Sequence, residues 1–419
     1  MNNIRLAGVY STRVELIPWR PSLLILSTTV AATLALALIL ALSAFLSRGE
    51  HSEHTFSLWQ WEASQLPSSI FTLLGVGKEL DAAEETERLA SYFRLTSAIR
   101  AELQADEPDQ ILLEELTKER SLFENDVERI IEGYVTNAVL HAGLRRPLPL
   151  FSGIAVLRPP VDIELTNPPQ LLVRSPRKEI RRAGDTLLSP DLGLTAIEKI
   201  EAQTDNENIV SLVVSIGGLA AYPAIVLENR SYGSVLRLAA HEWVHHYLAF
   251  YPLGEAWGQG EGTKLNETVA HVAEQEIARL ARELNPIALE TAADGRAPPH
   301  KHSLPDFPGT MRQLRLDVDK LLEQGLVAEA ETLMEKQRQQ FASHGINIRK
   351  INQAYFAFYG SYANLPQSSD PIGPKVERVW EETKHLALFM SLVRNIRTER
   401  DLDSILVKLG VDPENVTVD

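Results

Sequence analysis

The sequence predicts an α+β fold with an N-terminal transmembrane helix, a small mixed sheet and a mainly helical C-terminal half. Three observations carry this prediction. An uncharged apolar run occupies residues 22–47. Short runs rich in β-branched residues recur between 153 and 227. Long segments on both sides of those runs repeat apolar residues every three or four positions, the spacing of an amphipathic helix.

Length and composition limit the kinds of protein this chain can be. Its 419 residues suggest two to three domains, and a hydrophobic content of 44% is enough for a sizeable core. The net charge of −15 argues against a general nucleic-acid binder, because the phosphate backbone would be repelled. The chain has no Cys, so disulfides, thiolate catalysis and Cys-ligated zinc are excluded. Any metal must use His, Asp or Glu.

Residues 22–47 form the predicted transmembrane helix, after a cytoplasmic tail at 1–21. At about 1.5 Å per residue the run would reach ~39 Å, enough to span a hydrocarbon core of ~30 Å with tilt. Arg5, Arg13 and Arg20 precede it, so the positive-inside rule places the remaining chain outside the cytoplasm. A signal peptide cleaved near Ala41-Leu42-Ser43 is the alternative, but its apolar core would be shorter. We favour the uncleaved anchor.

Residues 48–145 read as a juxtamembrane connector and a helical region. The connector covers 51–77, and helical spacing of apolar residues follows at 80–105 and 111–143. From residue 147 the sequence changes to short runs in which apolar and polar residues alternate, and we expect these runs to form the strands of a modest sheet. Those expected strands are 153–157, 161–165, 170–174, 180–187, 209–215 and 224–227, with a helix at 194–206.

A basic cluster lies within this strand-rich region of an otherwise acidic chain. Its members are Arg174, Arg177, Lys178, Arg181 and Arg182. Such a cluster could meet lipid headgroups or an acidic partner. A solvated loop face is the alternative, and we favour it.

The motif His241-Glu242-Trp243-Val244-His245 carries the clearest chemistry in the chain. On a helix, positions i and i+4 share one face, so His241 and His245 can direct two imidazole nitrogens at one metal ion. Glu242 could then reach a water in an open coordination position and act as its general base. An exposed helix with incidental histidines is the alternative.

Glu267 is the expected third ligand. It lies on a second predicted helix at 265–284. Pro252 and several glycines between the two helices allow the chain to turn back, so that the helices run antiparallel. Two histidines and one carboxylate leave one position for water, which is the catalytic rather than the structural pattern of zinc sites.

The H-E-x-x-H motif followed by Asn266-Glu267-Thr268-Val269-Ala270 resembles the gluzincin metallopeptidases, the thermolysin-like and aminopeptidase-like zincins. The resemblance covers residues 236–278. It implies a zincin-like catalytic core at 146–285, with His241, His245 and Glu267 as zinc ligands and Glu242 as the base. Thermolysin-like members carry an Asp one turn after the third ligand, where it orients a ligand histidine. His271 stands there in this chain, and Glu274 is the alternative partner.

The stretch Gly217-Gly218-Leu219-Ala220 is the expected substrate-binding edge strand. It falls just before the metal helix, and zincins of this class line their cleft with a strand whose backbone pairs with the substrate. Glycine allows close backbone approach, and Pro223 suits an unpaired edge. A tight turn between buried strands is the alternative.

Residues 286–419 read as a C-terminal helical region. Helices are expected at 310–343 with a break near Gly325, at 376–397 and at 401–409. The aromatic stretch 350–363 is typical of core. Gluzincin relatives, however, place a Tyr or His from this part of the chain over the zinc, where it stabilises the oxyanion. Tyr355, Tyr359 and Tyr362 are the candidates, and we rank Tyr355 slightly ahead of Tyr359.

These features together predict a membrane-anchored zinc peptidase with one Zn²⁺ per chain. Its expected partners are a peptide or protein substrate and, through residues 22–47, the lipid bilayer; no nucleic acid is expected. The alternative is a non-catalytic, membrane-anchored partner-binding protein on a zincin scaffold, against which the intact Glu242 argues. A third possibility is an inverted anchor with the enzyme facing the cytosol.

Overall fold

The computed structural model describes residues 53–73, 80–144, 146–148, 151–157, 159–287, 306–360 and 370–416, and Glu53–Asp419 forms one compact unit. Helices and small sheets occur together, so the predicted α+β class is confirmed. The expected transmembrane segment 22–47 and Tyr362 lie outside the described residues. Among the helices that the structure does describe, none is long and apolar enough to cross a membrane.

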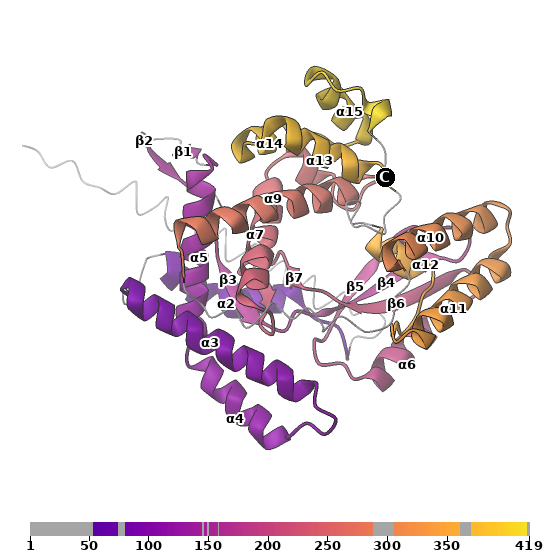
Figure 1. Ribbon diagram of the computed structural model, residues 1–419, viewed down its shortest axis with the longest axis horizontal. Helices are drawn as coiled ribbons and strands as arrows, with labels where there is room; N and C mark the ends of the chain where they lie inside the picture. Colours follow the sequence, from indigo (N-terminus) through magenta and orange to yellow (C-terminus); the bar gives the residue numbers. More distant parts are fainter. Residues whose placement is uncertain are drawn as a thin grey trace, which may run out of the picture. The chain divides into compact units, whose positions relative to one another are not determined.

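The elements follow one another as strands in the middle of the chain with helices on both sides (Figure 1). The helices are α2 (Leu58–Leu73), α3 (Ala82–Leu103), α4 (Gln110–Ser121), α5 (Glu124–His141), α6 (Leu194–Thr204), α7 (Tyr232–Leu248), α8 (Pro252–Glu255), α9 (Gly262–Leu284), α10 (Phe307–Glu323), α11 (Val327–Ser343), α12 (Gln353–Tyr359), α13 (Ile372–Thr383), α14 (Leu386–Val393) and α15 (Glu399–Lys408). The strands are β1 (Arg146–Leu148), β2 (Phe151–Val156), β3 (Ile163–Thr166), β4 (Gln170–Pro176), β5 (Asp185–Leu188), β6 (Ile209–Ser215), β7 (Gly218–Leu219) and β8 (Ala224–Leu227).

Two three-stranded sheets meet where β6 leads into β7. The first has the order β5-β4-β6 and is antiparallel throughout. The second has the order β3-β8-β7, with β3 parallel and β7 antiparallel to β8. The strand β7 therefore lies at an edge, and only residues 216 and 217 separate it from β6. The expected mixed sheet is thus divided into smaller sheets.

Helix α5 closes the other edge of the second sheet without adding a strand. The backbone N–H of Ile163 donates to Glu132 Oε1 at 2.9 Å, and that of Leu165 donates to Glu128 Oε1 at 2.7 Å. These carboxylates satisfy edge donors that would otherwise be buried without partners. Burial raises the pKa of Glu132 to about 8, and Asp162 and Glu164 add to that rise.

Among the described residues, three hydrophobic cores pack around the sheets. The larger core packs α3, α5, α7, α9, α13, α14 and α15 with β3 and β8. The second core packs α10, α11 and α12 onto one face of β4 and β6, through alternate residues such as Leu171 and Val173. Leu172 and Val213 point to the other face, where α6 covers them. This alternation follows from the period of two along a strand.

Several expected elements differ from the observed ones at their boundaries. The segment 111–143, expected to form one long helix or a pair, forms the pair α4 and α5. The expected helix at 376–397 is α13 and α14, because Lys384 between them adopts a left-handed conformation with φ of 46°. The expected strand at 180–187 begins only at Asp185, and the connector contains helix α2.

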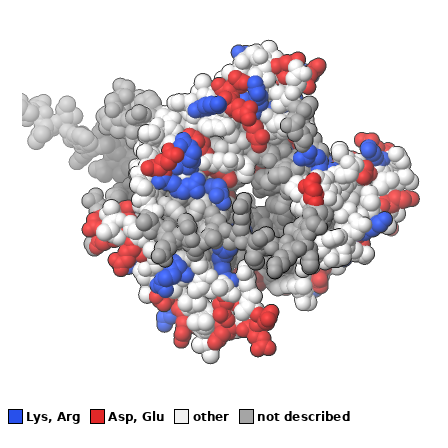
Figure 2. Space-filling model, in the orientation of Figure 1, with Lys and Arg blue, Asp and Glu red and all other residues white. Residues whose placement is uncertain are grey.

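The surface shown in Figure 2 interleaves acidic and basic side chains over the part of the chain that the structure describes. Three of the basic cluster's arginines are in ion pairs: Arg177 with Glu331, Arg181 with Glu179, and Arg182 with Asp185.

Candidate metal centre

Helix α7 is fixed by a buried apolar face and by one buried indole. Val235, Leu236, Ala239 and Val244 are buried in the larger core. Trp243, within the motif, is also buried, and its Nε1–H donates to the carbonyl of Pro159 at 3.0 Å. Trp243 faces the core, and the other polar residues of the motif, His241, Glu242 and His245, line a cavity.

Helix α9 packs against α7, and the two helices cross in the view of Figure 1. The chain turns through α8 and two glycines with positive φ, Gly258 at 76° and Gly260 at 49°. A Cβ on Gly262 would lie 2.1 Å from the carbonyl oxygen of Ala256, so only glycine lets α9 begin there. The expected chain reversal brings the second helix back to α7, and that helix starts three residues before the expected Leu265.

His241, His245 and Glu267 meet at one point in the cavity. The two Nε2 atoms are 3.0 Å apart, and Glu267 Oε2 lies 3.3 Å from His241 Nε2 and 3.6 Å from His245 Nε2. Ligand atoms of a tetrahedral site with bonds of about 2.0–2.1 Å are separated by about 3.3–3.4 Å. The spacing of the three atoms therefore suits a zinc-sized ion. Glu267 Oε2 is also buried without a hydrogen-bond partner, as expected of an atom whose partner is a cation.

The far nitrogen of each histidine is held by a residue of α9. His241 Nδ1 donates to Glu274 Oε2 at 2.6 Å, and His245 Nδ1 donates to Asn266 Oδ1 at 2.7 Å. The Asn266 amide is itself oriented, because its Nδ2 donates to the carbonyl of Leu253. Protonated Nδ1 atoms leave the Nε2 lone pairs directed at the common point, as metal-ligating histidines require.

The electrostatics of this cluster favour a bound cation. Burial opposes the charged form of His241, but the carboxylates of Glu267 and Glu274 outweigh it and raise the pKa of His241 well above its usual range. Burial likewise opposes ionisation of Glu267, yet the nearby imidazoles of His241 and His245 hold its pKa far below the usual range. Positive charge is thus stabilised at this point, whether a proton or a metal supplies it.

Glu242 lies beside the cluster, 5% exposed, and burial raises its pKa. It packs against β7 so closely that a Cβ on Gly218 would lie 2.4 Å from Glu242 Oε1. The same Cβ would lie 2.9 Å from the backbone carbonyl oxygen of Ile225, so a side chain at position 218 would clash with both β8 and the carboxylate that the motif predicts to be the base. From the sequence we expect a close backbone approach at the pair Gly217-Gly218, and in the structure the backbone of Gly218 lies close to the Glu242 side chain.

A cavity of about 660 Å³ opens over these residues. One wall is formed by α7 and α9, and residues 217–220 form its rim. The β7 edge opposite β8 is unpaired among the described strands. The position expected for a substrate-binding edge strand is therefore occupied by a real edge strand that lines the same cavity as the metal cluster.

The structure separates the two tyrosine candidates on α12. Tyr359 lines the cavity, whereas Tyr355 is buried in the second core and is not part of the lining. Their rings pack against each other with centroids 4.5 Å apart. Our ranking of Tyr355 ahead of Tyr359 therefore does not match this placement, because the helix turns Tyr355 towards β4 and β6.

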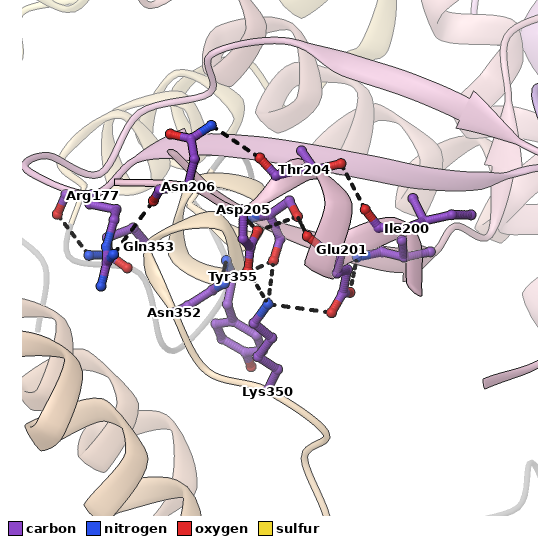
Figure 3. Close-up of polar contacts among 12 residues, drawn as sticks. Arg177, Ile200, Glu201, Thr204, Asp205, Asn206, Lys350, Asn352, Gln353 and Tyr355 are labelled. Atoms are coloured by element: carbon purple, nitrogen blue, oxygen red, sulfur yellow. Dashed lines mark hydrogen bonds and ion pairs between the residues drawn. The ribbon is translucent and has the colours of Figure 1, made fainter. Parts of the chain in front are cut away.

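A polar network clamps the start of α12 to the first sheet (Figure 3). Asn352 Oδ1 accepts from the backbone N–H of Tyr355 at 3.0 Å, and its Nδ2 donates to the carbonyl of Ser211 at 3.0 Å. Lys350 Nζ donates to the same carbonyl, and Gln353 Nε2 donates to the carbonyl of Arg177. These bonds set the position from which Tyr359 reaches the cavity.

Among the cavity residues that the sequence-based prediction does not single out are Trp257 and His246. Trp257, 45% exposed, packs its ring edge-on against His245 with centroids 5.3 Å apart. His246 lies 2.7 Å from the carbonyl oxygen of Ala221, and burial lowers its pKa to about 4, so Nε2–H of a neutral imidazole is the donor. A second histidine directly after the motif is the only signal that the sequence offers for this contact.

No family model, curated protein or solved structure matches this chain. The assignment of the site therefore depends on its own geometry.

Proposed function

We propose that the protein is a zinc-dependent peptidase. The observation that carries this proposal is the arrangement of Glu267 Oε2, which is buried without a hydrogen-bond partner at tetrahedral-edge distances from the Nε2 atoms of His241 and His245. A buried acceptor with two neighbouring nitrogen lone pairs is unfavourable unless a cation lies between them.

Zinc fits this donor set better than harder cations do. Two imidazoles and one carboxylate are typical of catalytic zinc, whereas magnesium and calcium prefer oxygen ligands. When bound, zinc acidifies a coordinated water and polarises a carbonyl group. The rest of the chemistry belongs to the side chains of this chain.

Glu242 is the proposed general base. Its carboxylate is buried next to the ligand cluster, and a raised pKa suits a group that takes a proton from water and returns it to the leaving amine. Tyr359 is the proposed oxyanion donor, since its ring lines the cavity. The backbone of 217–220 is the proposed binding strand, because an extended peptide can add to the free edge of β7.

The alternative is a non-catalytic scaffold that binds the metal but does not hydrolyse peptides. A scaffold needs neither a buried carboxylate beside the ligands nor a glycine that makes room for it. Glu242 and Gly218 together therefore favour the enzyme.

The membrane anchor at 22–47 remains part of the proposal, with the catalytic unit outside the cytoplasm. A reporter that is active only outside the cytoplasm, fused after Ser47, should be active, and the full-length protein should stay in the membrane fraction. A shortened soluble product would instead identify 22–47 as part of a signal peptide.

The decisive experiment is Glu242→Gln. The amide keeps the shape of the side chain but removes the basic carboxylate, and Glu242 is not among the three ligands. Zinc measured by elemental analysis should stay bound, while hydrolysis of a broad peptide library should fall by roughly 10²–10⁴-fold. Equal rates and products from the wild type and the variant would favour the scaffold, as would a zinc-loaded wild type that cleaves no peptide of any length.

A further inference from the structure

We infer that His246 is a positioning residue that ties the substrate-binding edge strand to the metal helix, and that it acts on binding of extended peptides rather than on the chemical step. This inference rests on the proposed function, because it assigns β7 to the substrate. His246 immediately follows the ligand His245, so one turn of α7 carries both the metal site and the tie.

The contact that makes the tie is specific. His246 Nε2 lies 2.7 Å from the carbonyl oxygen of Ala221. A carbonyl oxygen only accepts, so the histidine must donate. The ring of Tyr222 packs against the imidazole with centroids 5.6 Å apart. The backbone directly after β7 is thereby held both by a hydrogen bond and by ring packing.

The strand needs such an anchor because it has few bonds of its own. β7 consists of Gly218 and Leu219 alone, paired on one side with β8. The carbonyl of Gly217 accepts one further bond from the N–H of Leu227 at 3.0 Å, and the N–H of Ala221 donates back to the carbonyl of Leu219 at 2.7 Å. Two glycines in or beside the strand add backbone freedom. A hydrogen bond from α7 to Ala221 therefore removes motion at the strand's C-terminal end.

This arrangement links two parts of the site that the chain otherwise separates. The metal ligands and Glu242 lie on α7 and α9, whereas the strand belongs to the second sheet. An extended peptide can pair with β7 beside the metal cluster only if the strand is held in place at the cavity. The hydrogen bond from His246 to Ala221 fixes the C-terminal end of β7 relative to α7. The pairing of β7 with β8 does not fix that end.

Two substitutions separate the hydrogen bond from the ring packing. His246→Phe keeps a ring against Tyr222 and removes the donor, whereas His246→Gln keeps an N–H donor and removes the ring. Tyr222→Leu is the matched control, because it removes the ring partner and leaves the bond from His246 to Ala221 in place. Melting temperature and zinc content are measured for all three full-length variants.

The first readout is amide hydrogen exchange over residues 217–227 in the metal-free and zinc-loaded protein. One hydrogen bond contributes a few-fold to about tenfold in an equilibrium constant. His246→Phe should therefore speed exchange by about 3- to 10-fold, while His246→Gln and Tyr222→Leu stay near the wild type. Unchanged exchange in His246→Phe, or recovery with Phe but not with Gln, would overturn the inference.

The second readout is steady-state hydrolysis of a ten-residue peptide and of a capped dipeptide with the same residues around the scissile bond. His246→Phe should raise KM for the long peptide by about 3- to 10-fold with kcat nearly unchanged, and it should affect the dipeptide less. An equal loss of kcat on both substrates would exclude a role in strand positioning. Failure of the wild type on every peptide would count against the proposed function, and the exchange experiment would still decide the role of the tie.

Discussion

His241 Nδ1 and Glu274 Oε2 form a hydrogen bond of 2.6 Å. This bond lies on the side of the imidazole ring opposite Nε2, the atom that faces the point where the ligands meet. The bond orients the ring and raises the basicity of its other nitrogen. Glu274 lies one helical turn beyond His271 on α9, and its carboxylate reaches His241 Nδ1.

The first prediction concerns this partner. Glu274→Ala should lower zinc affinity by about 10- to 100-fold, because His241 loses the group that orients it. His241→Ala and Glu267→Ala should lower it further, since two protein ligands rarely retain catalytic zinc. The measurement is zinc competition with a chromophoric chelator. Full zinc content in both ligand variants would remove the metal assignment altogether.

The second prediction concerns Gly218. In Gly218→Ala the new Cβ would lie 2.4 Å from Glu242 Oε1 and 2.9 Å from the carbonyl oxygen of Ile225, so the carboxylate must move. Peptide hydrolysis should fall by at least about tenfold while zinc stays bound, because a displaced base loses its alignment.

Gly217→Ala is the matched control for that experiment. Its Cβ would meet Leu238 Cδ2 at 3.0 Å, the far end of a flexible side chain that can shift. Activity in this variant should stay within a few-fold of the wild type. If the two variants lose activity equally, the effect comes from strand flexibility and not from the position of Glu242.

The third prediction separates the two tyrosines. Tyr359→Phe should reduce kcat by about 10²–10³-fold, the usual cost of losing one oxyanion donor, with zinc content unchanged. Tyr355→Phe should leave kcat nearly unchanged, because that side chain is buried in the second core and does not line the cavity. The reverse result would show that α12 turns when substrate binds.

The ligand set is readable from the sequence because it depends on local spacing. The i, i+4 relation of His241 and His245 follows from the helix, and Glu267 follows from a chain reversal that Pro252 and the glycines allow. The edge strand was also predictable, since its glycines lie a short distance before the metal helix, with only β8 between them.

The rest of the site depends on contacts between distant elements, which one sequence does not encode in a recognisable pattern. Whether Tyr355 or Tyr359 faces the cavity depends on the rotation of α12, and that rotation is set by bonds from Asn352 and Gln353 to the first sheet. The contact from His246 to Ala221 joins α7 to the segment after β7. The spacing of residues along the chain does not define the geometry of the turn between them.

The fourth prediction concerns the pH dependence of stability. Burial raises the pKa of Glu132 from 4.5 to about 8, and the groups that face it are Asp162, Glu164 and Arg129. The folded protein therefore binds a proton more tightly here than the unfolded chain does. The stabilisation is complete below about pH 4.5 and is lost as the pH rises to about 8, by at most about 1.4 kcal/mol for each pH unit.

Glu132→Gln tests this directly. The amide oxygen can still accept from the N–H of Ile163, but the side chain no longer titrates. The free energy of unfolding, measured by urea denaturation, should therefore fall less between pH 5 and pH 8 in the variant than in the wild type. The two proteins should differ least near pH 4.5, where wild-type Glu132 is mostly protonated when folded. Glu124 and Glu128, whose pKa values burial also raises, should leave part of the slope in place. Parallel pH profiles for the two proteins would show that Glu132 ionises in the folded state at its ordinary pKa, so that α5 closes the sheet edge with a charged carboxylate.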